Sequence, residues 1–121
     1  MKALLFILVL LANISAKNLE NEKKLILVVV EMEFCPWCHK MNKETFDDAS
    51  SLKKLKEHFL IAKIKRESGD IPLFLEPKYF PTTYVLSWDG AKVIDELPGY
   101  MKKNSYLDYL ETLYEVENDI E

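Results

Sequence analysis

The chain of 121 residues is the size of one domain, and its hydrophobic fraction of 49% is sufficient for one globular core. Its charged fraction of 30% excludes a body embedded in a membrane. The net charge of −4 at pH 7 argues against nucleic-acid binding, which usually needs a basic surface. We therefore expect partners other than nucleic acid.

The first sixteen residues are typical of a secretory signal peptide. Lys2 supplies a positive charge, residues 3–11 form an unbroken apolar run, and the small residue Ala16 ends the segment. We expect cleavage after Ala16, a mature domain over residues 17–121, a periplasmic or secreted location, and no stable membrane insertion after cleavage. The alternative is an uncleaved anchor, although the apolar run is short for a membrane span of roughly 20 residues.

Two cysteines, Cys35 and Cys38, are separated by only two residues. Paired cysteines in an exported protein often form a structural disulfide. The stabilisation that a disulfide gives grows with the length of the loop it closes, and this loop is very short. A redox-active pair is therefore a better interpretation than a structural crosslink.

Residues 25–32 begin the expected domain with a continuous, largely β-branched run, which predicts a strand buried on both faces. Pro36 suits the first position of a helix, and apolar residues then recur at helical spacing as far as Phe46. Residues 51–58 predict a second helical piece, and residues 59–64 predict a second strand.

Residues 66–78 are the most difficult segment to assign, and we expect at most a short helix around residues 73–75. Residues 82–88 predict a strand that enters an Asp89-Gly90 turn, the strongest short hairpin pattern in the chain. Residues 92–97 then return as an antiparallel strand.

A closing helix is expected to start near Asn104 or Ser105, followed by an acidic, frayed tail over residues 116–121. The order of elements is strand, helix, strand, short helix, strand, strand, helix. This order predicts an α/β fold in which a βαβ unit precedes a ββα unit, with a central mixed sheet flanked by helices.

The cysteine pair lies where the first strand gives way to a helix. Helix N-termini carry partial positive charge and unpaired N–H groups, which stabilise a thiolate on Cys35. We expect Cys35 to be the exposed nucleophile and Cys38, one turn further in, to resolve a mixed disulfide. Pro36 would stiffen the turn, Trp37 would form a partly exposed surface over the site, and His39 would add positive charge.

The cysteine pair has two other interpretations. A metal site is disfavoured because structural zinc takes four ligands and the chain adds only His39 and His58 to its cysteines. We therefore expect no metal and no cofactor. Residues 35–39 also match the Cys-X-X-Cys-His pattern of c-type haem attachment, with Met101 as a distal ligand. The strongly apolar strand and the hairpin argue against that hypothesis, which stays open here.

Three stretches of the sequence resemble the landmarks of the thioredoxin family. They are Phe-Cys-Pro-Trp-Cys at residues 34–38, Phe-Pro-Thr-Thr at residues 80–83 and Pro-Gly-Tyr at residues 98–100. The chain is most similar to short exported bacterial thioredoxin-like proteins with a Cys-Pro-Trp-Cys active site. The resemblance implies the thioredoxin fold, a monomer, and exchange of the cysteine pair with protein thiols and a redox partner protein.

The resemblance also assigns roles outside the cysteine pair. It implies a cis bond before Pro81, a backbone at Phe80 that pairs with an extended substrate segment, and a Gly99 that lets the substrate approach closely. One departure concerns Val29, which stands where thioredoxins have a buried Asp. Glu31 is the nearest acidic residue, and its orientation does not follow from the sequence.

The sequence therefore predicts a protein thiol–disulfide oxidoreductase whose net direction is open. A partner-specific reductant is an alternative within that class. Outside it, a covalent haem carrier and a thioredoxin-like binding module that does not catalyse exchange remain as alternatives.

Overall fold

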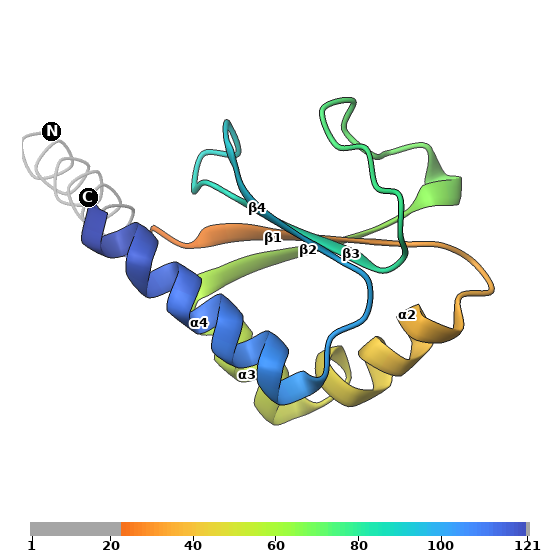
Figure 1. The fold of residues 1–121 in the computed structure, drawn as a ribbon, viewed down its shortest axis with the longest axis horizontal. Helices are drawn as coiled ribbons and strands as arrows, with labels where there is room; N and C mark the ends of the chain where they lie inside the picture. The colour runs from red at the N-terminus through yellow and green to blue at the C-terminus, as the bar shows by residue number, and fades with distance from the viewer. Residues whose placement is uncertain (1–22, 121) are drawn as a thin grey trace, which may run out of the picture.

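A four-stranded mixed sheet forms the centre of the molecule (Figure 1). The computed structural model describes residues 23–120, so the expected signal peptide at residues 1–16 lies outside the described residues. The strands are β1 (Leu25–Glu31), β2 (Phe59–Lys65), β3 (Thr82–Leu86) and β4 (Val93–Pro98). In the order β2-β1-β3-β4, β1 is parallel to β2 and antiparallel to β3, and β4 is antiparallel to β3. The predicted topology is confirmed.

Strand β1 lies inside the sheet and is buried on both faces, as its unbroken apolar sequence predicts. Successive side chains of a strand point to opposite faces. Leu27 and Val29 accordingly enter one apolar cluster, whereas Val28 and Val30 enter another. This central position carries the chain out of the sheet directly into the cysteine pair.

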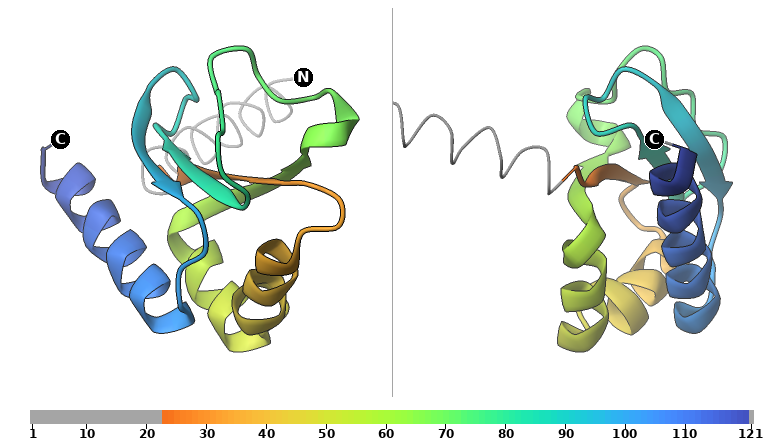
Figure 2. Two further views of the ribbon diagram at one scale, coloured as in Figure 1. Left: turned by 45° about the vertical axis from the view of Figure 1, so that its right-hand side comes forward. Right: turned by 90° about the vertical axis from the view of Figure 1, so that its left-hand side faces the viewer.

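Three α-helices cover one face of the sheet (Figures 1 and 2). They are α2 (Pro36–Met41), α3 (Ala49–His58) and α4 (Lys103–Ile120), and a π-helical segment, η1 (Asn42–Phe46), extends α2. Together with the sheet they enclose the main core, whose fully buried members include Leu27, Met41, Tyr106 and Leu110. Burial of these apolar surfaces is the largest stabilising contribution to such a domain.

Helix α4 is longer than the sequence suggested. Residues 116–121 were expected to form a frayed tail, but the helix continues to Ile120. His58 of α3 stacks on Tyr114 of α4 with ring centroids 4.0 Å apart, and its Nε2 lies 3.3 Å from a carboxylate oxygen of Glu111. These contacts hold the second half of α4 against α3, and acidic residues on its outer face are compatible with an exposed helix surface.

The other face of the sheet is covered by the segment between β2 and β3 (Figure 1). The expected short helix at residues 73–75 is wrong: Leu75 N donates to Pro72 O at 3.0 Å in a turn, and a 3-10 helix, η2, lies earlier at Arg66–Ser68. Pro72 has no N–H to donate to a helix. Leu75 is buried against the sheet, whereas Leu73 and Phe74 face solvent.

The predicted hairpin joins β3 to β4. Gly90 has a φ of +74°, in the left-handed region that favours glycine, and its N–H donates to Ser87 O at 2.8 Å. Ser87 N also donates to Lys92 O at 2.9 Å, so the turn is closed by backbone bonds. The hairpin places the end of β4, and therefore the start of α4, beside β3.

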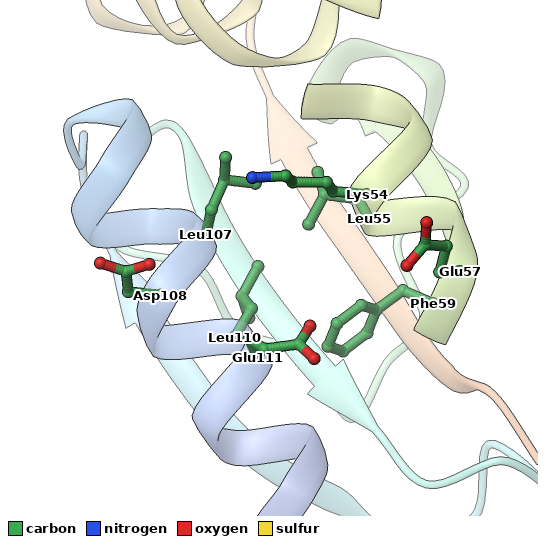
Figure 3. A pocket seen from close by; sticks show the side chains of 8 residues that line it. All are labelled: Lys54, Leu55, Glu57, Phe59, Leu107, Asp108, Leu110 and Glu111. Atoms are coloured by element: carbon green, nitrogen blue, oxygen red, sulfur yellow. The ribbon is translucent and has the colours of Figure 1, made fainter. Parts of the chain in front are cut away.

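A small cleft of about 230 Å³ separates α3 from α4 (Figure 3). Leu55, Phe59 and Leu110 form its apolar floor, and charged residues of the two helices form its rim. None of its lining residues belongs to the cysteine pair or to the segments around it. Within residues 23–120, no helix is both long enough and apolar enough to cross a membrane.

Candidate active site

Cys35 is the N-cap residue of α2, and Pro36 occupies the first helical position. The Cys38 N–H points at the Cys35 sulfur with an N···S distance of 3.1 Å, and His39 N donates to Cys35 O at 3.0 Å. Cys35 and Cys38 form a disulfide in this structure. In the reduced state the same N–H group and the positive end of the helix would stabilise a thiolate on Cys35.

The two cysteines differ less in exposure than the sequence analysis suggested. Cys35 was expected to be the exposed sulfur, but only 8% of the residue is exposed, compared with 4% of Cys38. The expectation of an exposed Cys35 is corrected for the disulfide state, because its sulfur lies against the backbone of Phe80. Cys35 is nevertheless the more exposed residue of the two, as expected.

A wall of backbone from β3 and the turn before it faces Cys35. The Phe80–Pro81 peptide bond is cis, as the family resemblance implies, and Phe80 O lies 3.6 Å from the Cys35 sulfur. Gly99 N donates to Pro81 O at 2.8 Å, and Gly99 has a φ of +83°, which favours glycine. The structure thus brings Phe80, Pro81 and Gly99 together beside the cysteine pair.

Phe34, immediately before the cysteine pair, is strained and exposed. Its φ of +55° is uncommon for a residue other than glycine, and 96% of the residue is accessible to solvent. Left-handed backbone at a bulky residue has an energetic cost and often occurs at functional sites. The sequence analysis used Phe34 only as part of a motif, and no sequence pattern revealed its conformation.

Aromatic rings lie on one side of the site. Trp37 is 55% exposed and its ring centroid is 5.3 Å from that of Tyr100, which confirms its predicted place as a partly exposed surface. Lys40 Nζ lies 5.4 Å from the Trp37 ring centroid and 5.0 Å from that of Tyr100. The Tyr100 hydroxyl donates to a carboxylate oxygen of Glu44, and this bond raises the pKa of Tyr100 above its ordinary value. The hydroxyl therefore remains a donor at neutral pH.

A more acidic hollow lies beside the same disulfide. It has a volume of about 550 Å³, and its lining includes Cys35, Cys38, Glu31 and Glu33. Glu31 accepts a hydrogen bond of 2.8 Å from the side-chain amide of Asn42. Its other carboxylate oxygen lies 3.5 Å from Nζ of Lys63.

The position of Glu31 resolves the question left by the sequence. Val29, at the position of the usual buried Asp, is an apolar core residue. Glu31 is largely buried instead, with 12% of its side chain exposed, and lines the hollow that contains both cysteines. Sequence reasoning missed Asn42 and Lys63 as its partners because the three residues come from elements far apart in the chain.

The remaining candidates divide between the site and the core. His39 lies next to Cys38 on the exposed side of α2 and lines the acidic hollow. Met101, which the haem hypothesis requires as a distal ligand, packs against the main core. The arrangement around Cys35 and Cys38 is therefore that of a dithiol–disulfide pair at a helix N-terminus, with the backbone of Phe80 beside it.

Comparisons with known proteins agree with this geometry. The family model of the thioredoxin-like domain matches residues 12–114. The chain belongs to the thioredoxin-like family, and its fold and Cys-X-X-Cys pair are those of a thiol–disulfide oxidoreductase.

Relatives in sequence and structure are similar over different shares of their length. A protein disulfide-isomerase from Triticum aestivum is 30% identical over 86 residues, which is 64% of this chain and 16% of that protein. A thioredoxin-fold protein from Helicobacter pylori matches with a TM-score of 0.66 and 21% identity, covering 77% of this chain and 70% of that one. The periplasmic thioredoxin SoxS from Paracoccus pantotrophus matches with a TM-score of 0.58 and 19% identity, covering 75% of this chain and 96% of that one.

Proposed function

We propose that this protein is an exported oxidoreductase that exchanges the Cys35–Cys38 disulfide with the thiols of other proteins. One observation carries the proposal: the Cys35 sulfur caps a helix N-terminus and lies 3.6 Å from the Phe80 carbonyl, beside the cis bond to Pro81. In the proposed complex, an extended substrate segment pairs with the backbone at Phe80, next to the Cys35 sulfur.

Exchange takes place in two attacks on sulfur. A substrate thiolate attacks the Cys35 sulfur, a substrate–Cys35 disulfide forms, and the Cys35–Cys38 bond breaks to leave a thiolate on Cys38. A second substrate thiolate then attacks the substrate sulfur of the mixed disulfide and releases Cys35 as a thiolate. The substrate dithiol loses two electrons and two protons, and the Cys35–Cys38 disulfide gains them. The reverse sequence reduces a substrate disulfide.

The proposal gives each group around the pair a role in these steps. The Cys38 N–H and the helix end stabilise negative charge on Cys35, which makes Cys35 the better leaving group and the thiol ionised first. Cys38 lies one turn inside the helix and is the less exposed residue of the pair, so it resolves the mixed disulfide from inside the site. Pro36 fixes the start of the helix, Trp37 and His39 border the pair, and Phe80, Pro81 and Gly99 form the docking wall.

The compartment and the partners are part of the same proposal. The apolar N-terminal run supports export, and one of the structures with the same fold is named a periplasmic thioredoxin. In the compartment a second redox protein would restore the pair after each turnover, with this chain acting as a monomer. The direction depends on the reduction potential, since 30 mV corresponds to about 1.4 kcal/mol for this two-electron couple.

A trapping experiment tests the proposed roles. The C38S variant should accumulate mixed disulfides with exported proteins, because the resolving attack is lost, whereas the matched C35S variant should trap none. Mass spectrometry of the trapped species would identify the substrates. Trapping by C35S but not by C38S would contradict the assignment, and absence of exchange between the wild-type pair and a neutral disulfide such as hydroxyethyl disulfide would contradict the function.

Export has its own test. N-terminal sequencing of the exported protein should find Lys17 at the first position. An intact Met1 would contradict cleavage and favour an anchor.

A further inference from the structure

A second hollow near the disulfide, with a volume of about 930 Å³, is lined by lysines that come from two distant parts of the chain. Lys40 and Lys43 belong to α2 and η1, whereas Lys102 and Lys103 lie where α4 begins. We call this hollow, with Tyr100 on its wall, the lysine groove. It adjoins the active site, because Lys40 and Tyr100 both contact the ring of Trp37.

The charge of the lysine groove is opposite to that of the molecule. Four lysines and three acidic residues line it, a formal balance of 4 − 3 = +1, whereas the whole chain carries −4. The neighbouring hollow with Glu31 and Glu33 contains two acidic residues and the single lysine Lys65, a balance of 1 − 2 = −1 with His39 neutral. The surface around the disulfide therefore presents regions of opposite charge to a docking partner.

The acidic residues of the groove are occupied by contacts within the chain. Glu44 accepts the hydrogen bond of Tyr100. Asp48 caps α3, accepting bonds of 3.1 Å from Ser51 N and 2.6 Å from Ser51 Oγ, and these two bonds lower the pKa of Asp48. Only Asp47 is left as an exposed acidic side chain of the lining without a hydrogen bond in the described residues.

The lysines, by contrast, have charge available for a partner. Within residues 23–120, none of the four has a carboxylate oxygen within 4.0 Å of its ammonium group. Lys40, Lys43 and Lys102 are exposed, and the ammonium of Lys40 is held over two aromatic rings. Desolvation of these groups by a bound carboxylate would be compensated by direct charge pairing.

The helix dipole disfavours both Lys102 and Lys103. Cations at a helix N-terminus oppose the helix dipole, and the first turn of α4 contains no acidic residue to offset them. Lys103 is attracted to Asp48, which contributes to the lowered pKa of Asp48, but Lys102 has no such partner among the described residues. Positions that break a local rule of stability are often functional.

We propose that the lysine groove binds an acidic segment of the partner polypeptide, next to the partner cysteine that reacts with Cys35. The proposal rests on the proposed function and extends it to a class of substrate. The Trp37 ring would contact residues between the reacting cysteine and the acidic segment. Charge complementarity of this kind acts mainly on the association rate and on the choice of partner.

Peptide kinetics test the proposal. Three short peptides, each with one cysteine protected as a disulfide with 2-mercaptoethanol, would carry glutamate, glutamine or lysine on both sides of it. The reduced protein should react with the glutamate peptide roughly tenfold faster than with the glutamine peptide at low salt. At 1 M salt, where the screening length is about 3 Å, this ratio should approach one. Equal rates at low salt, or a preference for lysine, would overturn the proposal.

Two charge-reversal variants locate the effect. K102E/K103E should lose the glutamate-to-glutamine rate ratio, with each rate divided by that variant's own rate for hydroxyethyl disulfide. The matched control K53E/K56E changes two exposed lysines of α3 outside the groove and makes the same change in net charge, so it should keep most of the ratio. If both variants lost the glutamate-to-glutamine rate ratio equally, the preference for acidic peptides would come from net charge, and the proposal that the lysine groove binds them would be overturned.

A binding measurement separates this inference from the proposed function. Glutamate peptides with serine in place of cysteine should shift the NMR signals of Lys40, Tyr100 and Lys102 in the wild-type protein, whether or not exchange takes place. Failure of exchange with hydroxyethyl disulfide would contradict the proposed function alone. Absence of these shifts at low salt, with exchange intact, would contradict the lysine groove alone.

Discussion

The two faces of the central sheet are built in different ways. On one face, three helices enclose a core that includes Leu27, Tyr106 and Leu110, each with no exposed surface. On the other, the segment between β2 and β3 covers Val28 and Val30 through Leu75, and leaves Leu73 98% exposed. Both faces contribute to the active site. The helix-covered face supplies the helix that bears the cysteines, and the loop-covered face supplies the backbone at Phe80 and Pro81.

The two faces hold their sides of the active site with different firmness. The helix-covered face fixes the positions of Cys35 and Cys38, because α2 is anchored through Cys38 and Met41 in buried positions. The loop-covered face has fewer buried apolar groups. Segments with few such groups open at low free-energy cost. We expect the substrate to adjust to the loop side while the reacting sulfurs stay in place.

The largest effect should come from removing core volume on each face. L110A should lower the free energy of unfolding by about 3–4 kcal/mol, because the helices around it cannot close the cavity. L75A should cost about 2 kcal/mol or less, since the loop that carries it can collapse onto the sheet. Denaturant titrations of both variants measure these costs, and a larger cost for L75A than for L110A would contradict the difference between the two faces.

Removal of a buried hydrogen bond on the helix-covered face should lower the free energy of unfolding by less. The hydroxyls of Thr83 in β3 and Tyr106 in α4 are 2.9 Å apart in the core. Y106F should cost about 1–2 kcal/mol, because Thr83 Oγ1 is left buried without a partner. The double variant T83V/Y106F should cost less than the sum of the two single variants, and additive costs would show that the bond does not join β3 to α4.

The smallest effect should be a difference in alkaline stability. Burial raises the pKa of Tyr106, and burial is also the main cause that raises the pKa of Tyr84. A raised pKa means that the fold favours the protonated form, so stability is complete below the unfolded pKa of about 10 and falls as the pH rises above it.

Unfolding measured from pH 8 to 11 checks this sign. Y106F should show a weaker decline of stability above pH 10 than the wild type, because one of the two buried phenols is gone. Y79F changes an exposed tyrosine and serves as the control, with a decline like that of the wild type. An unchanged decline in Y106F would indicate that Tyr106 does not contribute to the alkaline loss.

Much of the architecture could be predicted from local pattern. The apolar run of β1, the Asp89-Gly90 turn and the proline after Cys35 each determine a local structure from adjacent residues. The topology and the family landmarks then placed Cys35 and Pro81 together. These inferences succeeded because each depends on periodicity or backbone preference over a short stretch.

Other features depend on contacts between distant residues and were missed. Helix α4 continues past the stacking of Tyr114 on His58, a contact between distant residues that no local pattern in the acidic tail reveals. The low exposure of Cys35 comes from Phe80, 45 residues away in the chain. The network of Glu31 with Lys63 likewise joins two strands whose register the sequence did not determine.

The central claim is that Cys35 is the reactive thiol and Cys38 the resolving one. The most direct test is the rate at which iodoacetamide alkylates each cysteine of the reduced protein at pH 7, followed by mass spectrometry. We predict that Cys35 is alkylated at least about tenfold faster, because the helix end and the Cys38 N–H favour its thiolate, whereas Cys38 lies one turn inside the helix. Equal rates, or faster alkylation of Cys38, would contradict the account.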